Sequence, residues 1–117
     1  MIAGIGVDIV ETERIREIMK RKPRFADRIL TDREQKDFRR LPESRKTEYL
    51  AGRFAAKEAF AKALGTGIGK DLSFRDIEIQ TDPAGKPFFA KPKERGVHLS
   101  ISHSKTCAVA MVVIESP

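Results

Sequence analysis

Apolar and polar positions alternate near the amino terminus, as in a β-strand that packs one side against a core. Ile5, Val7 and Ile9 alternate there with Gly6 and Asp8. This segment therefore predicts a half-buried strand. Asp8 would point away from the apolar side, or into a polar site at its edge.

Four further strands are predicted in the second half of the chain. The range 76–80 alternates, and Asp82-Pro-Ala-Gly forms a turn into a hairpin partner over 86–90. The range 97–102 alternates again, whereas the run 107–114 is apolar on both faces, which is typical of a central strand. These segments predict an antiparallel sheet.

Helical periodicity fills most of the first half. Thr12 can cap a helix whose apolar positions face one way and whose arginines face the other, and Pro23 should end it. Thr31 opens a capping box that predicts a second helix over 32–41.

The longest predicted helix runs from about residue 46 to residue 64. Gly65 suits the left-handed residue that ends such a helix. Lys57 lies toward the far edge of this helix, where we expect a solvated side chain. With the strands, these helices predict an α+β fold. The apolar stripe of the long helix consists of Leu50, Phe54, Ala61 and Leu64.

Composition is that of an ordinary globular chain. Of 117 residues, 40% are hydrophobic and 34% are charged, and no apolar run has the length of a membrane span. The length indicates one domain over residues 1–117. Cys107 is the only cysteine, so no disulfide framework is available and a reducing cytoplasm is the expected compartment.

The net charge of +6 indicates an acidic partner. The basic residues concentrate in the first quarter of the chain, where they form either a solvated face or a docking surface. Only 7% of residues are aromatic and none interleave with the basic ones, which disfavours nucleic acid as partner. A small basic nucleic-acid-binding module remains the non-enzymatic alternative. The basic residues are Arg14, Arg16, Lys20, Arg21, Lys22, Arg24 and Arg28.

Two acidic positions could carry chemistry. Glu58 and Lys62 share one helical flank, where they form either an ordinary surface pair or part of a site. Asp8 is one acid inside an apolar strand, which is costly to bury without a partner or a metal. It is therefore either a water-facing or paired acid, or a metal ligand. Two carboxylates from separate elements would suit Mg²⁺.

Two other motifs fail as catalytic signatures. The glycines from Gly65 to Gly69 follow a helix rather than a strand and lack the Ser/Thr of a phosphate-binding loop, so they act as a helix stop. Ser102-His103-Ser104 lacks the nucleophile elbow of a hydrolase. His103 is then structural, or a phosphate or pantetheine contact if a site lies nearby.

Taken together, these residues resemble the bacterial holo-acyl-carrier-protein synthase family of phosphopantetheinyl transferases. The resemblance spans nearly the whole chain in order and spacing. The matching segments are Gly4-Ile-Gly-Val-Asp-Ile-Val, Arg24-Phe-Ala-Asp-Arg-Ile-Leu-Thr, the block 50–69, Leu72-Ser-Phe-Arg-Asp-Ile-Glu-Ile, Gly85-Lys-Pro and His98-Leu-Ser-Ile-Ser-His-Ser.

The resemblance implies the 4′-phosphopantetheinyl transferase fold, with an antiparallel sheet packed on the long central helix, in a trimer with sites between subunits. It also implies the reaction. Coenzyme A donates 4′-phosphopantetheine to a serine of apo-acyl carrier protein in fatty acid biosynthesis, and adenosine 3′,5′-bisphosphate is released. A transferase for carrier domains of secondary metabolism is the enzymatic alternative.

The resemblance further implies roles for individual residues. Asp8 and Glu58 would bind Mg²⁺, which bridges to the pyrophosphate, and Lys62 would stabilise phosphate charge. Either Glu58 or a metal-bound water would deprotonate the serine. Arg53, with Arg45, would bind the 3′-phosphate. Gly65, His103 and Ser104 would line the coenzyme pocket, and Arg14, Arg21, Arg24 and Arg28 would meet the acidic carrier.

Overall fold

The computed structural model describes residues 1–117 and confirms the α+β class. Strand β1 (Ile2–Glu11) is followed by helices α1 (Thr12–Arg21), α2 (Phe25–Ile29), α3 (Asp32–Arg40) and α4 (Glu43–Leu64). A short 3-10 turn, η1 (Phe74–Asp76), precedes strands β2 (Glu78–Thr81), β3 (Pro87–Lys91), β4 (Val97–His103) and β5 (Cys107–Glu115). No helix combines the length and apolar character that crossing a membrane requires.

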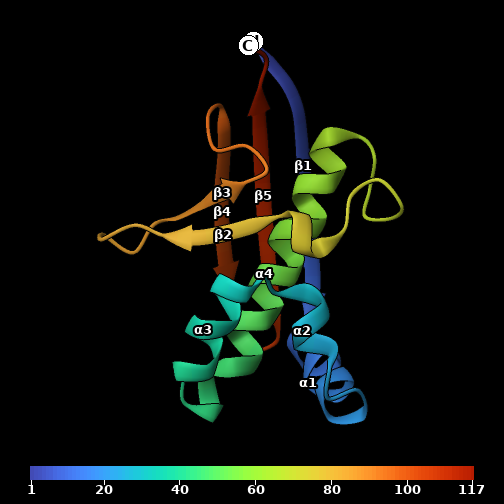
Figure 1. Cartoon of the computed structure of the whole chain (residues 1–117), viewed down its shortest axis with the longest axis vertical. Coiled ribbons are helices and arrows are strands. Elements are labelled where there is room, and N and C mark those ends of the chain that lie inside the picture. Colours follow the sequence, from blue (N-terminus) through green and yellow to red (C-terminus); the bar gives the residue numbers. More distant parts are fainter.

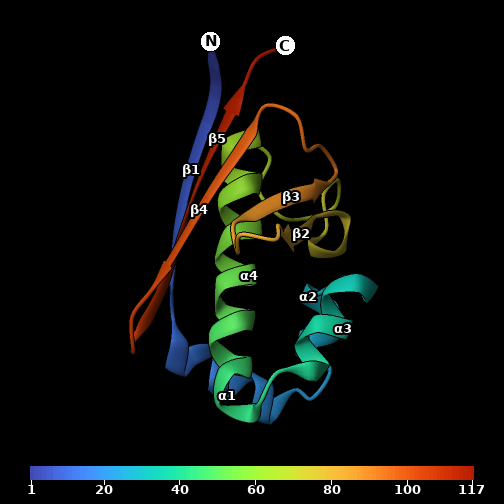
Figure 2. The same ribbon diagram turned by 90° about the vertical axis from the view of Figure 1, so that its left-hand side faces the viewer.

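Helix α4 forms the middle layer of the molecule (Figures 1 and 2). One side of it packs on an antiparallel sheet of order β1-β5-β4, so the run that is apolar on both faces is the central strand, as predicted. The β2–β3 hairpin, α2 and α3 lie on the other side of α4 (Figure 2). A single cluster of 19 buried apolar residues fills the space between the layers.

Local signals place most helix ends where the sequence predicts them. The capping box at Thr31 is present, and Gly65 ends α4 with a φ of 84°. Helix α4 begins at Glu43, earlier than predicted, because Pro42 occupies its N-cap and the first turn continues from there. Leu64 was predicted in the apolar stripe, but it is the last residue of α4 and is exposed.

Glycines let β1 pack directly on α4. A Cβ at Gly4 would lie 2.0 Å from the carbonyl oxygen of Ala63, and a Cβ at Gly6 would lie 2.0 Å from that of Ala59. Neither position can carry a side chain without moving the strand away from the helix. This glycine side of β1 is also the side on which Asp8 lies, because side chains alternate along a strand.

The alternation turns the apolar side of β1 outward. Ile5, Val7 and Ile9 are 64%, 58% and 64% exposed, so the prediction that they form the half-buried side is wrong for the single chain. The reason is that the glycine side approaches the helix. The β5 residues that pair with Ile5, Val7 and Ile9 extend this outer face, and no other element covers it (Figure 2). These outer residues of β5 are Val109, Met111 and Val113.

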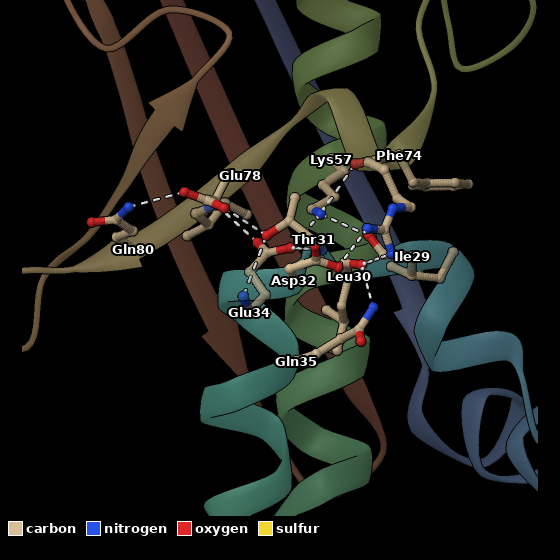
Figure 3. A network of polar contacts seen from close by, with 12 residues as sticks. Ile29, Leu30, Thr31, Asp32, Glu34, Gln35, Lys57, Phe74, Glu78 and Gln80 are labelled. Atoms are coloured by element: carbon tan, nitrogen blue, oxygen red, sulfur yellow. Dashed lines mark hydrogen bonds and ion pairs between the residues drawn. The ribbon is translucent and has the colours of Figure 1, made fainter.

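Lys57 is entirely buried, so the prediction of a solvated side chain is wrong (Figure 3). Its Nζ donates to Glu34 Oε1 at 2.6 Å, to the carbonyl of Ile29 at 2.7 Å and to that of Phe74 at 3.1 Å. Burial lowers the pKa of Lys57, and the Glu34 charge opposes that shift. The ammonium therefore joins α2, α3, α4 and η1 at one point.

Glu34 extends this network toward β2 (Figure 3). Its carboxylate accepts the backbone N–H of Thr31 at 2.9 Å and that of Ile79 at 2.8 Å. The Thr31 hydroxyl donates to Glu78, which also accepts a hydrogen bond from Gln80. The buried polar groups of this region thus have partners, as stability requires.

Candidate functional site

The first group of predicted site residues lies along the β1 edge of α4. Asp8 faces the helix, and Lys62 Nζ donates to Asp8 Oδ1 and to the carbonyl of Val7, both at 3.1 Å. The Asp8 side chain is only 17% exposed, whereas that of Lys62 is 53% exposed. The fold therefore brings these residues together, and Lys62 pairs with Asp8 rather than with Glu58.

Glu58 completes this group. Burial raises the pKa of its carboxyl, the Asp8 charge raises it further, and the Lys62 charge partly lowers it. Two carboxylates thus influence one another beside one lysine, and the three ionised groups together carry a net negative charge.

These donors fit a magnesium ion. No group of three or more His, Cys, Asp or Glu side chains lies anywhere in the chain in an arrangement that would hold a metal by itself. A site of two carboxylates suits Mg²⁺ because this ion takes one or two acids and fills its remaining positions with water and phosphate oxygens.

The second group lines a cavity of about 280 Å³ on the β4 side of α4. Arg45 and Arg53 from α4 and His103 from the end of β4 contribute basic side chains to it. His103 Nε2 lies 3.1 Å from Glu48 Oε1. The β2–β3 hairpin lines another part of the cavity with Thr81, Gly85 and Pro87.

Arg53 is held inside this cavity by neighbours that no sequence motif indicates. Its guanidinium carbon lies 4.3 Å from the centre of the Tyr49 ring, and Nη2 donates to Thr81 Oγ1 at 3.4 Å. Its Nε is buried without a hydrogen-bond partner. Tyr49 precedes Arg53 by four residues, so helical spacing alone could have indicated this contact.

The two groups lie on different flanks of α4. Strands β1 and β4 are the opposite edges of the sheet, roughly 10 Å apart across β5. Glu58 and Arg53 are five residues apart, which is about 140° around the helix. One chain therefore does not place the acidic pair and the basic cavity in one continuous site.

The remaining predicted residues lie close to one group or the other. Gly65 caps α4 just beyond Lys62, and its N–H donates to the Lys62 carbonyl. Ser104 follows His103, and its Oγ accepts the N–H groups of Thr106 and Cys107, both at 3.2 Å, within the β4–β5 turn. In this structure Gly65 and Ser104 therefore fix the backbone next to the acidic pair and next to the basic cavity, respectively.

The arginines predicted to meet an acidic carrier all lie at the surface of the helical end of the molecule. They are carried by α1, by the link after it and by α2, while Ile15 of α1 is buried beneath them. The predicted division of α1 into an apolar and a basic face is confirmed. These residues are Arg14, Arg21, Arg24 and Arg28.

Comparison with known proteins identifies relatives of the whole chain. Residues 4–113 match the model of the 4′-phosphopantetheinyl transferase superfamily. The holo-[acyl-carrier-protein] synthase of Geobacillus kaustophilus is 62% identical over 116 residues, which cover 98% of this chain and 90% of that protein. That of Anoxybacillus flavithermus is 59% identical, with coverage of 98% and 97%.

Solved structures agree with this relationship. The crystal structure of a holo-(acyl-carrier-protein) synthase from Bacillus anthracis in complex with coenzyme A (3′,5′-ADP) is 55% identical. It superposes with a TM-score of 0.93 over 100% of this chain and 99% of that one. The Helicobacter pylori holo-[acyl-carrier-protein] synthase in complex with coenzyme A is 38% identical, with a TM-score of 0.81 and coverage of 95% and 99%.

Proposed function

Because the chain belongs to the 4′-phosphopantetheinyl transferase superfamily, we propose a complete reaction for this enzyme. The serine hydroxyl of an apo-acyl carrier protein attacks the β-phosphorus of coenzyme A. A new serine–phosphorus bond forms, the bond from that phosphorus to the bridging oxygen breaks, and adenosine 3′,5′-bisphosphate leaves with that oxygen. The serine proton passes to the Glu58 carboxylate or to a water molecule as the bond forms.

The grouping of Asp8, Glu58 and Lys62 at one edge of α4, with the Lys62–Asp8 ion pair at 3.1 Å, is the observation that carries this proposal. Asp8 and Glu58 would hold Mg²⁺, which supplies positive charge to the pyrophosphate when bound. The half-exposed Lys62 ammonium can reach a phosphate oxygen while its stem stays on the Asp8 side of α4.

The basic cavity would bind the other end of coenzyme A. Arg45, Arg53 and His103 offer donors to the 3′-phosphate, and Arg presents paired N–H groups that match phosphate oxygens. Since the reacting groups lie on the other flank of α4, one coenzyme molecule would span two subunits. The uncovered apolar face of the β1-β5-β4 sheet supports the proposed homotrimer, because such faces are usually covered by a partner.

The exposed arginines of α1 and α2 would receive the acidic carrier protein of fatty acid biosynthesis. Opposite charge accelerates encounter and fixes orientation. The lone free Cys107 is compatible with the proposed cytoplasmic setting. Arg14→Glu should weaken carrier binding more than coenzyme A binding, and equal losses would mean that this helix serves the fold instead. A panel of apo-carriers from fatty acid and secondary metabolism tests the choice of carrier.

The chemistry is tested by mass spectrometry of apo-carrier incubated with coenzyme A, Mg²⁺ and enzyme. We expect the carrier to gain one phosphopantetheinyl group. Glu58→Ala should abolish this gain and weaken Mg²⁺ binding in calorimetry while the circular dichroism spectrum stays unchanged. Glu43→Ala is the matched control, because Glu43 is an exposed acid of the same helix. Full turnover by the Glu58 variant would disprove the ligand assignment.

The shared site is tested by mixing two variants, each of which should lose most of its activity by itself. Glu58→Ala removes one carboxylate of the acidic pair, and Arg53→Ala removes one guanidinium from the basic cavity. The two defects therefore lie on different flanks of α4. If sites form between subunits, mixed assemblies contain intact sites, about a quarter of the total after random exchange. Activity should then rise on mixing, and no recovery would mean that Glu58 and Arg53 of different subunits do not complete one site.

A further inference from the structure

We infer that Tyr49 is a positioning residue that lets the enzyme prefer a donor with a 3′-phosphate, because its ring holds the Arg53 guanidinium in the basic cavity. This inference rests on the proposed function, in which that cavity takes the 3′-phosphate of coenzyme A. It adds a residue that makes no contact with the phosphate itself and acts through Arg53.

The guanidinium of Arg53 is oriented chiefly by the ring. Its carbon lies 4.3 Å from the Tyr49 ring centre, well within the range of a cation–π contact. Its hydrogen bond from Nη2 to Thr81 Oγ1 is long at 3.4 Å, and the buried Nε has no partner. Donor groups of the guanidinium therefore remain available, while stacking restricts its plane.

Tyr49 is itself fixed by α3. Its hydroxyl donates to the carbonyl of Glu34 at 3.3 Å, and the Phe38 ring packs against it at 5.9 Å with a tilt of 40°. Burial raises the pKa of Tyr49 to about 12, so the hydroxyl stays a neutral donor at ordinary pH. The Glu34 backbone is in turn held by the buried pair with Lys57. The ring thus offers Arg53 a rigid surface.

A rigid surface matters because a free arginine must be ordered when it binds an anion. A guanidinium that is already held near its bound orientation loses less conformational entropy, so the ligand binds more tightly. This advantage applies only to a donor that uses Arg53. A donor without the 3′-phosphate gains nothing from the stack, so Tyr49 should affect the preference between the two donors.

The experiment compares kcat/KM for coenzyme A and for 3′-dephospho-coenzyme A with the same apo-carrier. Tyr49→Leu keeps an apolar side chain and removes the ring face, and its preference for coenzyme A should fall about three- to tenfold. The loss should appear in KM for coenzyme A, with kcat unchanged. Tyr49→Phe keeps the ring and should retain the preference. Phe54→Leu, a matched aromatic loss on another face of α4, should leave it unchanged.

Arg53→Ala separates failure of this inference from failure of the proposed function. If Arg53→Ala loses the preference but Tyr49→Leu retains it, the role of Tyr49 is wrong while the phosphate site stands. If Arg53→Ala retains the preference, the proposed phosphate site and the inference fall together. Should Tyr49→Leu not fold, a ring-fluorinated phenylalanine at position 49 keeps the shape and weakens the ring charge. The preference of this fluorinated variant for coenzyme A over 3′-dephospho-coenzyme A must then fall below that of Tyr49→Phe. Equal preferences in the two variants would overturn the inference.

Discussion

Removing Lys57 should destabilise the protein severely, although this lysine touches no proposed substrate. Lys57→Met leaves the Glu34 carboxylate buried without its ammonium partner, and both side chains are fully buried at a separation of 2.6 Å. Breaking such a pair on one side costs about 3–5 kcal/mol. Two backbone N–H groups still bind Glu34, which favours the lower end of that range. A chain of this length has roughly 6–18 kcal/mol of stability in total.

The assay is urea unfolding at neutral pH and one fixed protein concentration, followed by far-ultraviolet circular dichroism. With a slope of about 1.5 kcal/mol per molar urea, the midpoint should fall by about 2 M. Lys46→Met is the matched control, because Lys46 pairs with the exposed Glu43 on the same helix. It should change the free energy of unfolding by less than about 1 kcal/mol.

The double variant Lys57→Met/Glu34→Gln distinguishes the charge from the packing. It leaves no charge buried, so it should recover part of the stability lost by Lys57→Met alone, while its amide NH₂ leaves one of the two backbone N–H groups without an acceptor. A single variant as stable as the wild type would refute the reasoning. The same conclusion would follow if the double variant were no more stable than the single one, because the unpaired carboxylate would then not be the cause.

Three further predictions concern the rest of the molecule. Tyr49 is the only tyrosine and there is no tryptophan, so phenolate absorbance reports it alone, and its midpoint should lie near pH 12. Because the pKa of Tyr49 is raised, this group stabilises the fold fully below pH 10, and that stabilisation is lost as the pH rises toward 12. A titration midpoint near pH 10 would therefore contradict the burial of Tyr49. Gly6→Ala should cost at least about 3 kcal/mol in chemical unfolding, because its Cβ would meet the Ala59 carbonyl, whereas the open Gly69→Ala should be nearly neutral. Met111→Lys should dissociate the proposed trimer in light scattering and reduce activity without unfolding the chain, and an unchanged mass would exclude the outer sheet face as the interface.

Features encoded by neighbouring residues could be predicted from the sequence. The capping box at Thr31, the left-handed cap at Gly65 and the central strand over 107–114 depend on contacts within a few residues or on simple alternation. The family segments also indicated Asp8, Glu58 and Lys62 together, and the fold does bring them to one edge of α4.

Only the tertiary structure decided which sides of these elements are covered. Alternation in β1 reveals two sides, but the close approach of Gly6 to α4 determines that Ile5, Val7 and Ile9 face outward. Lys57 reads as an ordinary helical lysine until α3 and η1 enclose it. The sequence by itself thus determined the elements and the chemical groups, because those follow from local bonding. Burial and the separation of the acidic pair from the basic cavity arise from contacts between distant segments, which no local pattern records.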